Sequence, residues 1–201
     1  MPGPESSVQR HIALDISDRA GDRVHHIEME LDSGRVYHAM VAHSAVRQAL
    51  IERLVDTGCA AIVPPDGGLI GNLKVWENLV LPAAYHGGGA HRYAELEQRA
   101  ADLFAGFGIS GTGFDALCTT LPDHLTPFEQ RLCGFVRAMF TAPRIMVYDS
   151  LFDGLSRDHT GKVLAFDRVY HSRQGLPGTS LHLTADLPTL PDLGAHGTFH
   201  L

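Results

Sequence analysis

Hydrophobic and polar residues alternate at every second position along the first part of the chain. Residues 11–16 and 24–31 show this period of two, which predicts half-exposed strands that pair antiparallel. A turn sequence at residues 32–34 separates the second strand from a third predicted strand at residues 36–42. Residues 60–63 are all apolar and end at two prolines, so they predict a short buried strand.

The rest of the chain alternates between helical periodicity and short apolar runs. Apolar positions three and four residues apart predict helices over residues 45–55, 93–107, 127–142 and 162–173. An apolar run at residues 145–149 predicts a strand that ends in the carboxylate of Asp149, and residues 179–184 predict another strand. Because strands and helices alternate, we expect an α/β fold with a mostly parallel sheet. In such sheets, ligands bind at the carboxyl ends of the strands.

Length and composition narrow the classes of function. The 201 residues are 44% hydrophobic, which suits one folded domain with a buried core. The net charge of −7 excludes a protein that coats nucleic acid by charge alone, so we expect no nucleic-acid partner. No apolar run reaches the roughly 20 residues that span a bilayer, and we expect no direct membrane insertion. The N-terminal sequence lacks a secretory apolar core, and the cysteines lack metal-type spacing, so we expect a cytoplasmic protein.

Residues 125–155 carry the strongest resemblance to a known family. The stretch begins LTPFEQR, continues with an Arg-Ala pair at 137–138 and Pro143, and reaches Asp149 without a gap. It resembles the ATP-binding subunits of ABC transporters, in which an LSGGQ signature opens a helix and a strand ending in Asp-Glu follows. Residues 149–155, DSLFDGL, look most similar to the lipid-trafficking branch of that family.

Two further segments agree with this resemblance and come in the family's order. Residues 69–82 are similar to the stretch after the family's glutamine loop, which contacts the membrane subunit, and residues 179–187 look like the last strand and histidine switch. The resemblance implies a P-loop-NTPase-like ABC ATPase core with a mostly parallel sheet and small N-terminal antiparallel strands. It also implies a single domain over residues 1–201, with a helical subdomain at about residues 70–142.

The segment that corresponds to the family's phosphate-binding loop has lost its glycines. Counted from Gly34, the pattern G-x-x-G-x-G-K-S-T falls on residues 41–49, VAHSAVRQA. Glycine allows the close backbone approach and positive φ with which such a loop surrounds phosphates. The degenerate nucleotide-binding residues are Ser44, Arg47 and Gln48. Arg47 keeps the charge of the family's lysine but not its shape, and Gln48 replaces the hydroxyl that ligates Mg²⁺.

Other functional positions also depart from the family. Pro65 stands at the glutamine that senses Mg²⁺, Ser150 at the glutamate that polarises water, and Ala185 at the switch histidine. Pro127 and Phe128 replace the two signature glycines. The signature-equivalent residues are Leu125, Thr126, Pro127, Phe128 and Glu129. With the base and the glycines missing, we assign no catalytic residue.

The framework is retained where the chemistry is lost, which predicts a degenerate ABC ATP-binding subunit that does not hydrolyse ATP. It would serve as a regulatory or scaffolding partner of a transporter, and we expect no cofactor. A first alternative is an active but divergent subunit that binds ATP and Mg²⁺ and energises an exporter or lipid transporter. A second alternative is a small-molecule binder that reuses the nucleotide cleft near Asp149 and His43. Asp149, the family's magnesium-side residue, is either a weak metal ligand or a hydrogen-bond partner of nearby loops.

The resemblance also implies partners. These are a second ABC ATPase subunit, in a homodimer or heterodimer, and a membrane permease that would hold the chain at the inner face of the membrane. The expected partner surface consists of Leu73, Val75, Trp76 and Glu77. For Trp76 two interpretations stay open, because it either anchors a partner helix or packs beneath the helical subdomain.

Three other patterns have simpler explanations than the chemistry they suggest. Gly106, Gly108 and Gly111 match a dinucleotide-binding pattern, but they follow a predicted helix, and we expect a helix end and a loop with no helix opening at Gly111. The 13 histidines lack metal-ligand spacing, so we expect solvated or core histidines, or a pH-sensitive surface. Ser150 lacks a nucleophile elbow, and we expect a buried or capping hydroxyl there.

Overall fold

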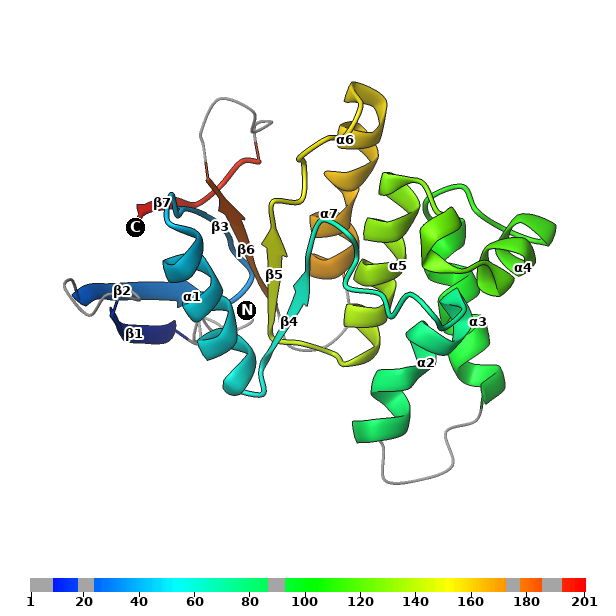
Figure 1. Ribbon diagram of the computed structural model, residues 1–201, viewed down its shortest axis with the longest axis horizontal. Coiled ribbons are helices and arrows are strands. Elements are labelled where there is room, and N and C mark those ends of the chain that lie inside the picture. The colour runs from blue at the N-terminus through cyan, green and yellow to red at the C-terminus, as the bar shows by residue number, and fades with distance from the viewer. Residues whose placement is uncertain (1–8, 18–23, 87–92, 173–177, 186–192) are drawn as a thin grey trace, which may run out of the picture. The chain divides into compact units, whose positions relative to one another are not determined.

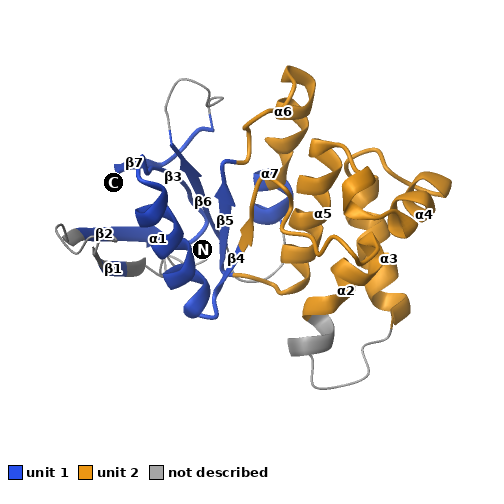
Figure 2. Ribbon diagram, in the orientation of Figure 1, with its two compact units in different colours: residues 1–61, 144–150, 167–201 blue, residues 62–143, 151–166 orange. Residues whose placement is uncertain are grey.

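The chain divides into two compact units, shown in different colours in Figure 2. The computed structural model describes residues 9–17, 24–86, 93–172, 178–185 and 193–201. Unit 1 comprises residues 1–61, 144–150 and 167–201, and unit 2 comprises residues 62–143 and 151–166.

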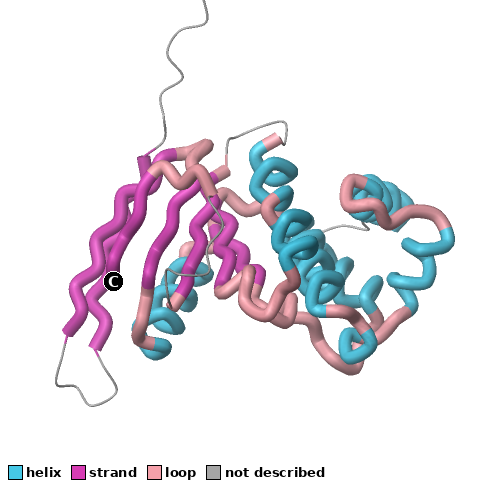
Figure 3. Tube along the Cα trace, turned by 90° about the horizontal axis from the view of Figure 1, so that it is seen from above, coloured by secondary structure: helices cyan, strands magenta, loops and turns pink. Residues whose placement is uncertain are grey.

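Unit 1 is built around a five-stranded sheet with the strand order β4-β5-β6-β3-β7 (Figures 1 and 3). The strands are β3 (Val36–Met40), β4 (Ala60–Val63), β5 (Ile145–Asp149), β6 (Thr179–Thr184) and β7 (Gly197–His200). β3 pairs in parallel with both β6 and β7, and β5 pairs in parallel with β6. The predicted α/β fold with a mostly parallel sheet is therefore confirmed.

Helices cover both faces of this sheet. Figures 1 and 3 show α1 (Ser44–Asp56) on one face and α7 (Ala165–His171) on the other. Successive strand residues point to opposite faces, so the register of β5 with β6 places Tyr148 beside His182 on the same face. That face also meets α7, because His171 Nε2 lies 3.0 Å from Ser180 Oγ. Ser180 and His182 of β6 thus lie with Tyr148 of β5 on the face of the sheet that meets α7.

The N-terminal strands form a separate two-stranded sheet in unit 1. β1 (Gln9–Ser17) pairs antiparallel with β2 (Val24–Asp32), from Gln9 opposite Asp32 to Ser17 opposite Val24. The alternation of apolar and polar residues predicted both strands and their antiparallel pairing, and both predictions are confirmed. Ile27, Met29 and Leu31 fall on one side of β2 and are buried, as a period of two requires.

Unit 2 consists of helices. They are α2 (Val75–His86), α3 (Tyr93–Ala105), α4 (Thr112–Thr119), the 3₁₀ turn η1 (Pro122–His124), α5 (Pro127–Phe140) and α6 (Arg157–Val163). α5 forms the centre of the unit, with most of its residues buried. Phe135 stacks on Phe166 with ring centroids 4.4 Å apart. Gly134 lets α5 approach the loop before α2, because an added Cβ would lie 2.5 Å from the Gly67 carbonyl oxygen.

Three expectations from the periodicity are corrected by the structure. α4 begins directly after Gly111, which is its N-cap at a φ of 54°, so the expectation that no helix opens there is wrong. The expected helix over residues 162–173 is two helices as far as residue 172, since α6 ends at Val163 and α7 begins at Ala165; residue 173 lies outside the described residues. Phe107 lies beyond the end of α3 and packs edge-on against Phe166.

Candidate functional site

The carboxyl ends of β3, β5 and β6 meet at one edge of the sheet in unit 1, as parallel strands require. Asp149 is the last residue of β5, and Ser150 follows it with a positive φ of 50°. The Ser150 N–H donates to the Leu183 carbonyl at 2.9 Å, which ties this turn to β6. The Val41 N–H, just after β3, donates to the Thr184 carbonyl at 2.8 Å. The backbone around this edge is therefore fixed by its own hydrogen bonds.

Arg47 points from the first turns of α1 to the end of β5. Its Nε lies 3.6 Å from Asp149 Oδ1, and its Nη1 donates to Ser150 Oγ at 3.1 Å. The Ser150 hydroxyl donates in turn to Asp149 Oδ1 at 3.3 Å. Arg47, Asp149 and Ser150 thus form one connected group in which a guanidinium neutralises the retained carboxylate. The sequence interpretation of Ser150 as a buried hydroxyl is confirmed, since only 7% of the residue is exposed.

The other two predicted nucleotide-binding residues lie apart from this group. Ser44 is exposed at the first residue of α1. Gln48 is exposed and donates through Nε2 to Glu52 Oε1 at 2.9 Å, one turn further along the same helix. Arg47 alone of the three predicted residues is therefore brought to Asp149.

The signature-equivalent residues open α5 in unit 2, and their polar groups bind one another. Thr126 is the N-cap, and its Oγ1 accepts from the Glu129 N–H at 3.3 Å. Glu129 Oε2 accepts from the Thr126 N–H at 2.8 Å and from the Thr126 hydroxyl at 2.7 Å, which completes a capping box. Pro127 has no N–H to offer. Leu125, just before the cap, is buried.

Phe128 occupies the second signature-glycine position and is buried. Its ring stacks on His159 with centroids 5.1 Å apart, and the Lys162 Nζ lies 5.3 Å from the centroid of the same ring. The start of α5 is therefore covered by aromatic and cationic side chains of α6, where the family has exposed glycine backbone.

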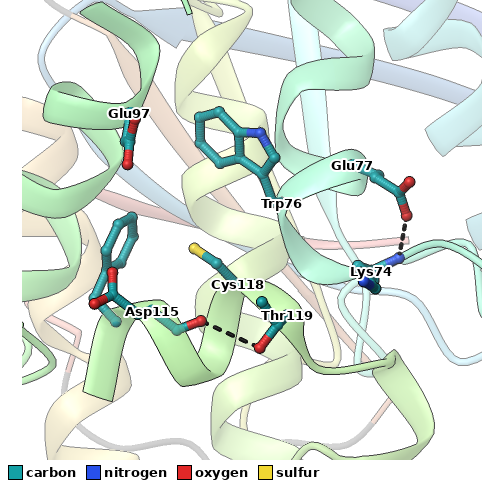
Figure 4. A pocket seen from close by; sticks show the side chains of 8 residues that line it. Lys74, Trp76, Glu77, Glu97, Asp115, Cys118 and Thr119 are labelled. Carbon is teal, nitrogen blue, oxygen red and sulfur yellow. Dashed lines mark hydrogen bonds between the residues drawn. The ribbon is translucent and has the colours of Figure 1, made fainter. Parts of the chain in front are cut away.

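The expected partner surface lies at the start of α2, and its residues differ in exposure. Val75 is completely buried, so its side chain supports the surface without forming part of it. Leu73 and Trp76 are half-buried, and Glu77 is exposed. Trp76 and Glu77 line a cavity of about 420 Å³ (Figure 4). Trp76 is thus partly covered and also lines the cavity, and its role as an anchor for a partner helix stays a prediction.

Asn78 lies in the stretch of residues 69–82 that resembles the family, and the sequence assigned it no structural role. It is fully buried, and its amide binds the loop that precedes α2. Oδ1 accepts from the Ile70 N–H at 2.7 Å, and Nδ2 donates to the carbonyls of Ile70, Leu73 and Lys74 at 3.0–3.1 Å. The sequence signal for this role is an amide residue in the first turn of a helix, where its side chain can bind the backbone of the preceding turn.

A buried histidine network lies on the α7 face of the sheet. His182 Nε2 donates to Asp167 Oδ2 at 2.8 Å, and the His182 ring stacks on Tyr148 with centroids 4.6 Å apart. Burial raises the pKa of Asp167, but hydrogen bonds from His182 and Ser180 outweigh it, so the net pKa is lowered. His182 is thus a core residue with a hydrogen-bond partner, as the sequence interpretation of core histidines expected.

Within the described part of the chain, no group of three or more His, Cys, Asp or Glu side chains is arranged to hold a metal ion. In those same residues, no helix combines the length and the apolar character that crossing a membrane requires.

No family model matches the chain. Two curated proteins are similar to part of it: the molybdenum import ATP-binding protein ModC of Pseudomonas aeruginosa, 29% identical over 112 residues, and the methionine import ATP-binding protein MetN of Cereibacter sphaeroides, 27% identical over 128 residues. These matches cover 56% and 64% of this chain, but they span only 28% and 33% of the relatives' own lengths.

Solved structures agree with these relatives. CbiO1 from Clostridium perfringens, part of an ABC transporter complex, matches with a TM-score of 0.72 at 14% identity, covering 96% of this chain and 84% of that one. An ATP-binding cassette in a dimeric post-hydrolysis state with ADP and Pi matches with a TM-score of 0.66 at 15% identity, covering 89% of this chain and 88% of that one. The resemblance to ABC transporter ATP-binding subunits is thereby confirmed at the level of the fold. Similarity to the lipid-trafficking branch stays a prediction.

Proposed function

Because the chain has the fold of an ABC transporter ATP-binding domain, we propose that it is a degenerate subunit that does not hydrolyse ATP and acts as a regulatory or scaffolding partner of a transporter. The observation that carries this proposal is the placement of the Arg47 guanidinium against Asp149 and Ser150. The chain's own guanidinium is thereby paired with Asp149, the residue that corresponds to the family's magnesium-side carboxylate.

The residues at the strand ends do not fit Mg-ATP. The family also has a cation at the position of Arg47, but here the guanidinium itself contacts Asp149 and Ser150, so a divalent cation beside Asp149 would have to displace it. A phosphate-binding loop needs several backbone N–H groups that point outward, whereas the Val41 N–H is bonded to Thr184 and the segment contains no glycine. We therefore derive no reaction step through ATP or Mg²⁺ for this chain.

The side chain at the water-activating position also argues against hydrolysis. Ser150 stands where the family has a glutamate, and its hydroxyl accepts from Arg47 and donates to Asp149. A hydroxyl engaged in this way, beside a guanidinium, is a poor acceptor for the proton of a water molecule. Asp149 is held by the same two side chains, so it does not supply the missing base.

The start of α5 supports the same proposal from the other unit. In the fold family this helix start presents backbone and hydroxyl donors to the nucleotide of a second subunit. Here the capping box consumes the Thr126 hydroxyl and the Glu129 N–H, and the negative charge of Glu129 already lies at the helix N-terminus. A further anion would have to displace that carboxylate.

The proposed partners are a second ABC ATPase subunit and a membrane permease, with the chain located in the cytoplasm at the inner face of the membrane. The support is the similarity to import ATP-binding proteins and the accessible side chains at the start of α2. Leu73, Trp76 and Glu77 offer apolar, aromatic and acidic groups there, a combination that suits a protein partner.

Isothermal titration with Mg-ATP tests the loss of nucleotide chemistry. We expect no saturable binding at micromolar concentrations, and phosphate release no faster than in buffer alone. Asp149→Asn is the matched variant, since it removes the retained carboxylate while preserving its shape. Micromolar binding that needs Mg²⁺ and is lost in Asp149→Asn would overturn the proposal.

Photo-crosslinking in cells tests the partner role. A photoreactive amino acid replaces the exposed Glu77, and the same replacement at exposed Glu52 in unit 1 serves as the control. We expect adducts with a permease only from the Glu77 position, identified by mass spectrometry. Permease adducts equally abundant from both positions, or none from Glu77, would contradict the proposed surface.

A further inference from the structure

The cavity beside Trp76 is a feature of unit 2 that the proposed loss of nucleotide chemistry leaves unexplained. It has a volume of about 420 Å³, and its lining residues come from α2, α3, α4 and the residue just before α2. Figure 4 shows the Trp76 indole pointing into the cavity, with Glu97 and Asp115 on the side opposite Lys74. An aromatic face and several charged groups therefore meet in one concave site.

The lining carries more negative than positive charge. Glu77, Glu97 and Asp115 contribute three carboxylates, while Lys74 contributes one ammonium group. Glu77 is already engaged, because its Oε2 accepts from the Lys74 N–H at 2.7 Å. The negative charges of Asp115 and Glu97 add to burial in raising the pKa of the Cys118 thiol to about 11. The two carboxylates thus both raise the pKa of one thiol in the cavity wall, that of Cys118.

Two exposed apolar side chains lie on segments joined to the start of α2. Ile70 is 41% exposed, and Asn78 ties its backbone to α2. Leu121 is 39% exposed and follows Thr120, whose carbonyl accepts from the Val75 N–H at 2.9 Å at the start of α2. Exposed apolar side chains therefore occur on the segments connected to the start of α2, which suits an occupant that carries apolar residues beside its charged group.

We propose that this cavity binds an arginine side chain carried by a segment of a partner protein, with apolar residues beside the arginine. A guanidinium is flat, so it stacks on the Trp76 indole while its edge donates hydrogen bonds to the Glu97 and Asp115 carboxylates. The excess of carboxylates over ammonium groups complements its charge. A metal ion fits less well, because these carboxylates do not converge into a metal-binding group in the described structure.

This inference deepens the proposed partner role by naming the chemistry of the partner segment. It is independent of the nucleotide site, since the cavity residues all lie in unit 2 and the Arg47 group lies in unit 1. A titration with Mg-ATP and a titration with an arginine peptide can therefore fail separately.

The chain contains one tryptophan, so Trp76 fluorescence reports directly on the cavity. The probe is a capped pentapeptide with a central arginine between leucines, and its matched controls carry citrulline or lysine at the centre. We expect a saturable change in Trp76 fluorescence and at least about tenfold tighter binding of the arginine peptide than of either control. Binding should weaken as the salt concentration rises. Equal affinity for the citrulline or lysine peptide, or no fluorescence change, would overturn the proposal.

A charge-neutralising variant locates the interaction in the cavity. The double substitution Glu97→Gln with Asp115→Asn should weaken binding of the arginine peptide at least about fivefold. The control Asp56→Asn with Asp123→Asn changes the net charge equally at exposed positions outside the cavity and should leave the affinity unchanged. Circular dichroism verifies that both double variants are folded. The comparison of the three peptides uses the unmodified chain, so it tests the proposal even if a variant does not fold. Equal affinities of the two double variants would refute binding at this site.

Discussion

Asn78 offers the sharpest test of how unit 2 builds its surface. Its fully buried amide makes one hydrogen bond as acceptor and three as donor, all to the loop that leads into α2. Asn78→Ala removes these bonds and leaves a small cavity. The Leu73 carbonyl and the Ile70 N–H then lose their hydrogen-bond partner. Because this part of the loop is folded against α2, water does not fully replace the lost bonds.

The magnitude follows from the groups left unpaired. Each buried donor or acceptor without a partner costs about 1–3 kcal/mol, and the exposure of Ile70 reduces its share. We expect Asn78→Ala to lower the free energy of unfolding of unit 2 by about 3 kcal/mol. Asn78→Asp keeps the oxygen that accepts from Ile70, but it directs a carboxylate oxygen at three carbonyls. A buried charge without a counterion costs about 3–5 kcal/mol, so this variant should be the less stable of the two at neutral pH.

The direction of the pH effect separates charge from packing. The introduced carboxyl is buried and faces carbonyl oxygens, so its pKa in the folded state lies above its unfolded value of about 4. A raised folded pKa favours folding below the unfolded pKa, and this contribution is lost as the pH rises. The deficit of Asn78→Asp relative to the unmodified chain should therefore shrink as the pH falls from 8 towards about 4.

Urea unfolding followed by Trp76 fluorescence measures these differences, because Trp76 lies in the same unit. Asn72→Ala is the matched control, since Asn72 is exposed in the same loop and should change stability by less than about 0.5 kcal/mol. Equal stability of Asn78→Ala and Asn72→Ala would refute the reasoning. A deficit of Asn78→Asp that does not change with pH would refute the electrostatic part alone.

Gly134→Ala should destabilise unit 2 by about 1–3 kcal/mol, because the new Cβ would lie 2.5 Å from the backbone of Gly67. Gly161→Ala should instead stabilise α6 by up to about 1 kcal/mol, because no atom lies within 4 Å of the new Cβ, and thermal melts of the two variants measure the difference. Because its pKa is about 11, the Cys118 thiol should react with Ellman's reagent at pH 8 at least about tenfold more slowly than free cysteine does. The kinetic phase that disappears in Cys118→Ser is the one that belongs to Cys118. Burial lowers the pKa of His38, so the histidine of the unfolded chain is protonated first and the stability of the fold falls as the pH drops through about 6.5. In urea unfolding at pH 7 and 5.5, His38→Gln should lose less stability between the two pH values than the unmodified chain. An equal loss in both proteins would contradict this.

The strands were predictable because their patterns are local. β4, β5 and β6 have the bounds that the sequence predicted, and the apolar run of β5 is typical of a strand buried on both faces. β7 was missed because GTFH has no apolar run and exists as a strand only through its pairing with β3. The start of α6 had a usable signal, because the Ser156 hydroxyl caps it by accepting from the His159 N–H.

The candidate site was predictable in part for a similar reason. Strand order and chain direction bring Arg47 near Asp149, since both lie at carboxyl ends of parallel strands or just beyond them. Their 3.6 Å contact depends on the side-chain conformation of Arg47 and on the turn at Ser150, which no sequence pattern encodes. The cavity beside Trp76 was out of reach, because it requires α4, whose start after Gly111 the periodicity did not reveal.

The placement of charge connects the proposed loss of catalysis to the proposed partner site. In unit 1 the cation of Arg47 neutralises Asp149, and in unit 2 the carboxylate of Glu129 neutralises the start of α5. Both places where the fold family binds nucleotide are thus compensated by side chains of this chain. Glu97 and Asp115 instead face a cavity in which carboxylates outnumber cations. Charge complementarity gives binding specificity where charge is left uncompensated, so a partner should recognise the chain at the cavity and not at the former nucleotide positions.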